Sequence, residues 1–264
     1  MATGFGGEVA TYYARHRRGY PPEVVDALAA AFRLGGDDTV VDLGCGTGQM
    51  SLPLADRVDR VISVDPEPDM LAIARRTALD QGMANATWVL GSDSDVPALS
   101  RLLGEGSVGA LTVAVAIHFM DRDTLFEAAR PLLRPEGGIA VVTNGEPLWT
   151  QDTEWSLALR GCLERMLGHP VTARCQTDED GRRRNREALV RAGYRYEETS
   201  VRYDAPLTVD DMVGGVLSAT SAERLPTEPQ RERFTAELRD ALGGRTEVIE
   251  SVRVWLQCGV RDEG

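Results

Sequence analysis

The stretch from Thr39 to Met50 constrains the fold more than any other part of the chain. Its residues, TVVDLGCGTGQM, begin with a short apolar run around Asp42 and continue with glycine at every second position from Gly44 to Gly48. A short apolar run bounded by glycines is typical of a buried strand that leads into a tight turn. Glycine tolerates positive φ and lets the backbone approach a ligand closely. The segment therefore predicts a ligand site at the end of a strand.

Strand and helix patterns alternate from this stretch to about residue 143. The patterns predict strands at 60–65, 86–90, 108–119 and 139–143, with helices starting at Pro21–Pro22, after the glycines, near Asp69 (a candidate N-cap), at 97–103 and at 123–133. Such alternation predicts a parallel sheet covered by helices on both faces. The rhythm breaks beyond Asn144, where we expect helices at 153–167, 177–192, 209–217 and 229–242 and strands at 194–203 and 246–260.

A length of 264 residues fits one α/β domain. We divide it into an N-terminal helical arm over 1–36, a ligand-binding core over 37–143, and lid helices with the final strands over 144–264. The first dozen residues are expected to be loose until something covers them, and the last third is expected to add cover to the same sheet.

Charge and cysteine usage exclude several classes of function. The formal net charge is −12, which disfavours non-specific binding to nucleic acid or to an anionic membrane. No stretch is apolar enough for a leader peptide or a membrane span, so we expect a cytoplasmic protein without membrane partners. The four cysteines are scattered without metal-ligand spacing, and we predict no metal site: Cys45, Cys162, Cys175 and Cys258.

Two ligand classes compete for the glycine stretch. A dinucleotide site needs GxGxxG, but here the spacing is GxGxG and Gln49 stands where that pattern requires its last glycine. A carboxylate at Asp42 would repel phosphate and would suit a cationic ligand. Asp65 closes the next predicted strand, 17 residues after Gly48, where a carboxylate is placed to bind ribose hydroxyls. The pattern therefore favours a cationic nucleoside-type ligand over a pyrophosphate.

These residues resemble the class I S-adenosylmethionine-dependent methyltransferases. The opening residues 13–21, YARHRRGYP, are similar to the Tyr-Ala-Arg-Tyr-Arg-Pro-x-Tyr-Pro start of a small-molecule branch of that family. Residues 91–97, 116–119 and 133–138 resemble three further motifs of the branch in the right order. The resemblance covers about residues 10 to 145 and implies a Rossmann-like α/β fold with a seven-stranded, mostly parallel sheet. Helices would lie on both faces, with a helical lid inserted after strand five.

The resemblance also implies roles for individual residues. S-adenosylmethionine would be the cofactor and S-adenosylhomocysteine the product. Most implied contacts are with the cofactor: Tyr13, Arg17, Asp42, Gly44, Cys45, Gly46, Gly48, Gln49, Asp65, Pro66, Met70, Ser92, Asp93 and Ala116. Asp42 would lie near the methionine ammonium, Asp65 would hold the ribose, and Tyr13 and Arg17 would close over the methionine carboxylate. The sequence departs from the family where Arg18 replaces proline, Phe119 replaces tryptophan and Asp93-Ser94 replaces Ala-Glu.

The acceptor side is described less well by the sequence. His118 is the candidate catalytic residue, either as a general base or as a wall of the cofactor pocket. Phe119, Trp149 and Trp155 are candidate acceptor-binding residues, and their character predicts a small, partly apolar, aromatic or terpenoid acceptor. Trp149 and Trp155 could equally form the core of the lid. The sequence does not distinguish methylation of oxygen, nitrogen or carbon.

The predicted reaction is in-line transfer of a methyl group to a small molecule of secondary metabolism, with nucleic acid excluded as a partner. Two alternatives stay open: an enzyme on the same fold that catalyses a non-transfer reaction such as cyclisation, and a non-catalytic cofactor-binding protein. A nicotinamide dehydrogenase is disfavoured because Gln49 breaks the glycine spacing. The aromatic N-terminal arm could pack on its own lid or on that of a second copy in a homo-oligomer.

Overall fold

The computed structural model describes residues 4–171 and 177–262. It contains one seven-stranded sheet in the order β3-β2-β1-β4-β5-β7-β6. The strands are β1 (Thr39–Leu43), β2 (Arg60–Asp65), β3 (Ala86–Leu90), β4 (Val108–Ala114), β5 (Leu133–Val142), β6 (Arg195–Thr208) and β7 (Glu247–Val260). The first five are parallel, whereas β7 runs antiparallel to both β5 and β6. The predicted fold class, a mostly parallel Rossmann-like sheet, is confirmed.

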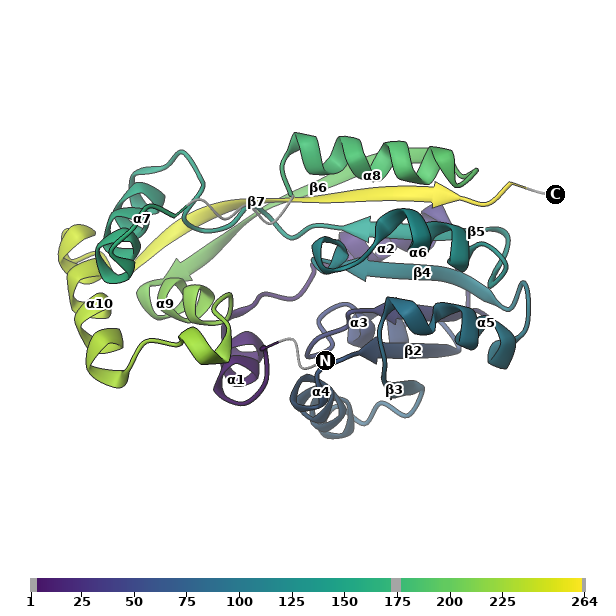
Figure 1. The fold of residues 1–264 in the computed structure, drawn as a ribbon, viewed down its shortest axis with the longest axis horizontal. Helices are drawn as coiled ribbons and strands as arrows, with labels where there is room; N and C mark the ends of the chain where they lie inside the picture. Colours follow the sequence, from purple (N-terminus) through teal and green to yellow (C-terminus); the bar gives the residue numbers. More distant parts are fainter. Residues whose placement is uncertain (1–3, 172–176, 263–264) are drawn as a thin grey trace.

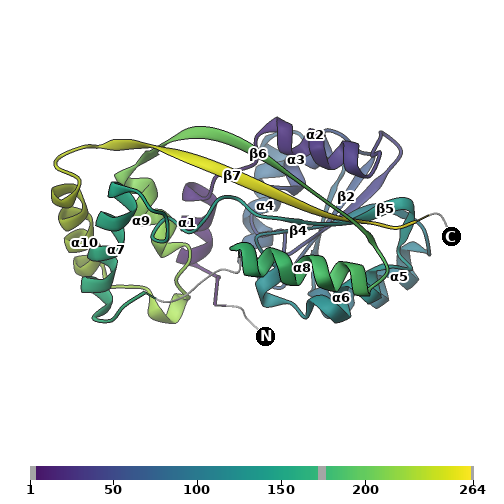
Figure 2. The same cartoon turned by 90° about the horizontal axis from the view of Figure 1, so that it is seen from above.

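Helices cover both faces of the sheet, with α2 and α3 on one side and α5, α6 and α8 on the other (Figure 2). The helices are α1 (Glu8–His16), α2 (Pro22–Ala31), α3 (Ser51–Ala55), α4 (Pro68–Asp80), α5 (Val96–Leu103), α6 (Arg122–Ala129), α7 (Glu154–Leu167), α8 (Glu179–Arg191), α9 (Val209–Leu217) and α10 (Glu228–Ala241). Two apolar clusters, one on each face, fill the space between sheet and helices.

Helices α7, α9 and α10 form a lid with a core of its own. This core contains Trp149, Trp155, Leu159, Met212 and Phe234 and is separate from the clusters on the sheet. The long hairpin β6–β7 runs from the sheet to the lid (Figure 1). The expected cover on the same sheet is therefore supplied by α8, which packs on β6 and β7, whereas α7, α9 and α10 form the helical lid that the resemblance implies.

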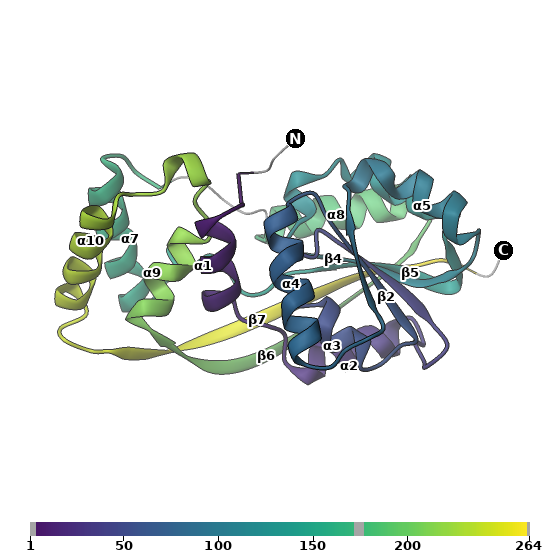
Figure 3. The ribbon, with the colours of Figure 1, turned by 90° about the horizontal axis from the view of Figure 1, so that it is seen from below.

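The first helix of the N-terminal arm, α1, begins at Glu8, and it is covered by the lid and the core, so the expectation that the first dozen residues are loose until something covers them stays a prediction for the uncovered arm. Helix α1 lies between the lid and the core and contacts α9 on one side and α4 on the other (Figure 3). The Gly7 amide donates to Asp69 Oδ2 over 2.6 Å. On the lid side, Arg231 of α10 donates to Glu8 and to Tyr12. Asp69 thus holds the arm instead of capping α4, whose N-cap position is Glu67.

The fourth strand ends earlier than the sequence predicts. Val115 adopts φ 53°, a left-handed conformation that is costly for a β-branched residue and interrupts the strand. The chain then forms a short 3-10 helix over Ile117–Phe119, so His118 lies beyond the strand end. Among the described residues, no helix is both long and apolar enough to cross a membrane.

Candidate functional site

The glycine turn after β1 has the conformation that its spacing predicts. Gly44, Gly46 and Gly48 all have positive φ, at 70°, 54° and 89°, which side chains rarely tolerate. The turn is fixed to the neighbouring strand because the Gly44 and Cys45 amides both donate to the Val64 carbonyl. A Cβ at Gly44 would lie 2.6 Å from the Ala116 Cβ. Only glycine therefore allows the turn to fit against the end of β4.

Asp42 lies behind this turn, out of contact with solvent. Its carboxylate accepts hydrogen bonds from Ser51 Oγ at 2.5 Å and from Thr112 Oγ1 at 2.7 Å. Burial raises the pKa of Asp42 to about 6, even though both hydroxyls oppose that shift. Asp42 therefore lies behind the turn and does not line the pocket, and its predicted place near the methionine ammonium stays a prediction.

Asp65 connects the turn to the end of β2. Its Oδ2 accepts from the Gly46 amide at 2.8 Å, and its Oδ1 accepts from the Glu67 amide at 2.9 Å. Burial raises the pKa of Asp65, while these two backbone bonds act in the opposite direction. A carboxylate has about four lone-pair sites, so each oxygen keeps capacity for one more donor, such as a ribose hydroxyl.

Tyr13 and Arg17 of the arm lie over the glycine turn. A Cβ at Gly46 would lie 3.5 Å from Tyr13 Cε1. The Arg17 guanidinium is 5.5 Å from the centre of the Tyr13 ring, within the range of a cation–π interaction. Burial raises the pKa of the Tyr13 hydroxyl, so it stays protonated at neutral pH. The arm therefore brings an aromatic ring and a positive charge to the place that the sequence predicts.

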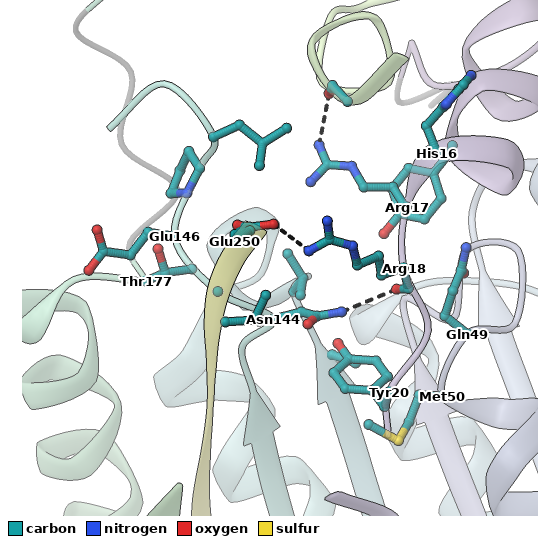
Figure 4. Close-up of a pocket in the computed structure, with 18 of the residues that line it drawn as sticks. His16, Arg17, Arg18, Tyr20, Gln49, Met50, Asn144, Glu146, Thr177 and Glu250 are labelled. Carbon is teal, nitrogen blue, oxygen red and sulfur yellow. Dashed lines mark hydrogen bonds and ion pairs between the residues drawn. The ribbon is translucent and has the colours of Figure 1, made fainter. Parts of the chain in front are cut away.

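One pocket extends from the glycine turn to the lid (Figure 4). Six of the predicted site residues line it: Tyr13, Arg17, Gly44, Cys45, Gln49 and Trp149. The remaining walls come from the arm, from the ends of β4 and β5, from the lid and from the hairpin: His16, Arg18, Tyr20, Met50, Ala114, Val115, Asn144, Gly145, Glu146, Pro147, Leu148, Thr177, Leu207, Gly215, Glu250 and Val252.

Arg18 and Glu250 form an ion pair in the pocket wall that the sequence analysis missed (Figure 4). The Glu250 side chain is 5% exposed and also accepts from Gln151 Nε2 at 2.8 Å. The sequence of β7 contains a signal for this ion pair, because Glu250 shares its face of the strand with Val252 and Val254. A carboxylate in an inward-facing register needs a partner. Arg18, which stands where the resembled family has proline, supplies it.

Several predicted site residues lie outside this pocket. Met70 is buried in the first turn of α4, and Pro66 precedes that helix. Ser92 is the N-cap residue of the short 3-10 helix that contains Asp93. The glycine turn itself contains Gly46 and Gly48, and it is contacted by Asp65 and Ala116. Trp155 is buried in the lid core. Phe119 is 62% exposed, and its ring meets Phe5 of the arm edge-on at 5.6 Å.

His118 also lies outside the pocket lining, with its ring 3.9 Å from that of Phe119. Burial, and then the charge of Arg17, lower the pKa of His118. The imidazole is therefore neutral at neutral pH and able to accept a proton. Within the described part of the chain, no three His, Cys, Asp or Glu side chains gather closely enough to hold a metal ion.

Comparisons with known proteins agree with this geometry. Residues 40–137 match the family model described as a methyltransferase domain. An uncharacterized methyltransferase of Mycobacterium tuberculosis (strain ATCC 25618 / H37Rv) is 38% identical over 146 residues, which are 54% of this chain and 53% of that protein. The chain thus spans about half the length of the curated relative that it matches.

Solved structures share the fold over most of the chain. The YcgJ protein of Bacillus subtilis superposes with a TM-score of 0.57 and 16% identity, over 92% of this chain and 99% of that one. Geranyl diphosphate C-methyltransferase of Streptomyces coelicolor A3(2), in complex with S-adenosyl-L-homocysteine among other ligands, gives a TM-score of 0.50 and 20% identity. That match covers 90% of this chain and 75% of the other.

Proposed function

We propose that this chain is a class I S-adenosylmethionine-dependent methyltransferase and that it transfers a methyl group from that cofactor to a small, partly apolar molecule. One observation carries the proposal. A single pocket has the glycine turn, at Gly44 and Cys45, in one wall and lid residues such as Leu148 and Trp149 in another. A cofactor at the turn and an acceptor under the lid would therefore share one pocket.

The residues at the turn fit this cofactor. Gly44 and Cys45 line the pocket, and Gly44 has no side chain that would occupy it. The Arg17 guanidinium supplies a positive charge for the methionine carboxylate. The Asp65 oxygens, already fixed by two backbone amides, would accept the ribose hydroxyls. Asp42, from its buried position, adds negative charge behind the turn, which suits a cationic ligand better than a phosphate.

The bound cofactor would supply a methyl group already activated by its sulfonium. The contribution of the chain is then to orient the acceptor in line with that group and to exclude water, an effect worth about 7–11 kcal/mol in well-oriented reactions. The lid and arm close the space over the turn. The apolar surface of Leu148, Trp149 and Leu207 would hold the acceptor, while the Tyr20 hydroxyl faces the cavity beside Asn144 (Figure 4) and can orient a polar group.

We propose His118 as the residue that accepts a proton when the acceptor must lose one. Its lowered pKa supplies the neutral form. A side-chain movement would be needed to bring the imidazole to the pocket. Replacement by alanine should lower the rate by ~10²-fold or more if it acts as a base, with the loss reduced at high pH. A small loss of rate that does not depend on pH would indicate that His118 only forms part of the wall of the cofactor pocket.

The transfer reaction is tested by incubating the purified chain with methyl-labelled S-adenosylmethionine and a panel of terpenoid and aromatic acceptors. The expected result is label in an extractable product together with an equal amount of S-adenosylhomocysteine. Tight cofactor binding without transfer to any acceptor would count against the proposal. Turnover without S-adenosylhomocysteine would indicate a non-transfer reaction instead.

A further inference from the structure

Two glycines in α9 let this lid helix lie close to its neighbours, Gly214 beside the arm and Gly215 beside the loop that follows β5. A Cβ at Gly214 would lie 2.1 Å from His16 Cγ, and one at Gly215 would lie 2.8 Å from Leu148 Cδ1. Glycine weakens a helix interior by about 1 kcal/mol relative to alanine. The close approach therefore has a local cost, which the contacts between α9 and the arm offset.

The close approach allows Ser218, which follows α9 and is fully buried, to hold Arg17. Ser218 Oγ accepts from Arg17 Nε at 2.8 Å and donates to the Gly215 carbonyl at 2.8 Å. The same carbonyl accepts from Arg17 Nη2 at 3.5 Å. Because the serine proton is committed to Gly215, the hydroxyl can act toward Arg17 only as an acceptor.

Arg17 keeps unused donors toward the pocket. Arginine has five N–H groups. Among the described residues, Arg17 Nη1 has no hydrogen-bond partner, and the Arg17 guanidinium has no carboxylate partner. The side chain nevertheless lines the pocket and lies over the Tyr13 ring. A positive charge held in one orientation, with free N–H groups beside the glycine turn, is a site for an anionic group.

We infer that Ser218 is a positioning residue, which orients the Arg17 guanidinium so that its free N–H groups bind the carboxylate of the cofactor. The inference rests on the proposed function, because the carboxylate is that of the methionine moiety. It makes the lid part of the cofactor site through a residue 201 positions from Arg17 in the sequence. By thermodynamic reciprocity, cofactor binding should also strengthen the contact between arm and lid.

The test compares two ligands that differ in the amino-acid moiety. S-adenosylhomocysteine has the carboxylate, whereas 5′-methylthioadenosine has the same nucleoside without the amino acid. In calorimetry, Ser218→Ala should bind S-adenosylhomocysteine about tenfold more weakly and methylthioadenosine as the unchanged chain does. Equal losses for both ligands, or no loss for either, would overturn the inference. A purely structural role for Ser218 would give one of those two results.

The chain offers a matched control in Thr220. Its hydroxyl donates to the Val216 carbonyl at 2.9 Å, the same kind of contact with the preceding helical turn, but without a bond to Arg17. Thr220→Ala should therefore leave both affinities unchanged. Ser218→Cys, which keeps the side-chain volume while weakening the acceptor, should reproduce the selective loss if the alanine variant is too unstable to measure.

A double-mutant cycle with Arg17→Met separates this inference from the proposed function. If Ser218 acts through Arg17, Ser218→Ala should cause no further loss of S-adenosylhomocysteine affinity in the Arg17→Met background. Additive losses would contradict that route. If the unchanged chain bound neither S-adenosylmethionine nor S-adenosylhomocysteine, the proposed function itself would fail, a result distinct from selective failure of the Ser218 variants.

Discussion

Asp42 is fully buried, and its carboxylate accepts hydrogen bonds from the hydroxyls of Ser51 and Thr112 and from the Ser51 backbone amide. Its pKa in the folded chain is about 6, above the ordinary value of 3.8. The folded state therefore binds this proton more tightly than the unfolded state does. The resulting stabilisation is complete below about pH 4 and is lost as the pH rises through about 6.

Asp42→Asn should remove this pH dependence. Relative to the unchanged chain, the variant should gain up to roughly 3 kcal/mol of unfolding free energy between about pH 4 and about pH 8, the equivalent of a shift of about two pKa units. Urea denaturation at several pH values measures the difference. Asp56→Asn, at an exposed position, is the control and should show no such trend. A constant difference for the Asp42 variant would refute the assignment.

Asp65 is predicted to have two roles, since it holds the Gly46 and Glu67 amides and would hold the ribose. Asp65→Ala should lower the affinity for S-adenosylhomocysteine by ~10- to 100-fold, because charge-assisted hydrogen bonds are worth about 1.5–3 kcal/mol. Calorimetry measures this loss. Asp80→Asn, exposed on α4 and paired with Arg76, should bind normally. An unchanged affinity for the Asp65 variant would eliminate the ribose contact.

At the scale of the elements, Gly214 controls how closely α1 and α9 pack. Gly214→Ala would place a methyl group 2.1 Å from the His16 ring atoms Cγ and Cδ2, and the forced separation should cost about 1–3 kcal/mol of unfolding free energy. Gly161, inside α7, is the matched control because a Cβ there would meet only Arg165 Nη1, at 3.5 Å. Gly161→Ala should leave stability unchanged or raise it by up to about 1 kcal/mol. Equal effects of the two substitutions would contradict this packing argument.

The elements also show where prediction from the sequence succeeds. Strands β1, β2 and β3 and helix α9 have local signals, namely apolar runs or helical spacing with clear boundaries, and lie where the sequence predicts. The end of β4 was missed because the reversal at Val115 arises from its surroundings and not from a glycine or proline. The sequence predicts a helical arm over 1–36 but does not give the bounds of α1, because only Val9 and Ala10 are buried along this helix and its sequence lacks a long apolar stripe.

The candidate site likewise has one part with local sequence signals and one part without them. One wall of the pocket comes from one contiguous segment and the arm, so spacing and resemblance could name four residues that line it, namely Gly44, Cys45, Tyr13 and Arg17. Its lid side depends on contacts between residues far apart in the chain, such as Arg18 with Glu250 and Arg17 with Ser218. Such pairs are set by how the hairpin and α9 return to the arm, and neither Glu250 nor Ser218 belongs to a local motif.

At the scale of the whole molecule, α1 is a short link between two bodies with separate cores. A nine-residue helix is marginal on its own, and this one has no side-chain cap at its start. Its contacts to Asp69 of the core and to Arg231 and Ser218 of the lid hold it in place. Local opening of α1 should therefore require less free energy than opening of α2, which packs on the sheet.

A ligand bound between the arm and the glycine turn should stabilise the closed arm, because it contacts Tyr13 and Arg17 only when α1 is in place. At a hundredfold excess over Kd, this linkage amounts to about 2.7 kcal/mol, so amide hydrogen exchange in α1 should slow by up to about a hundredfold with S-adenosylhomocysteine. Exchange in α2 should stay nearly unchanged and serves as the internal control. Slowing spread evenly over both helices would indicate a general gain in stability, and an unaffected α1 would show that the arm does not close over the ligand.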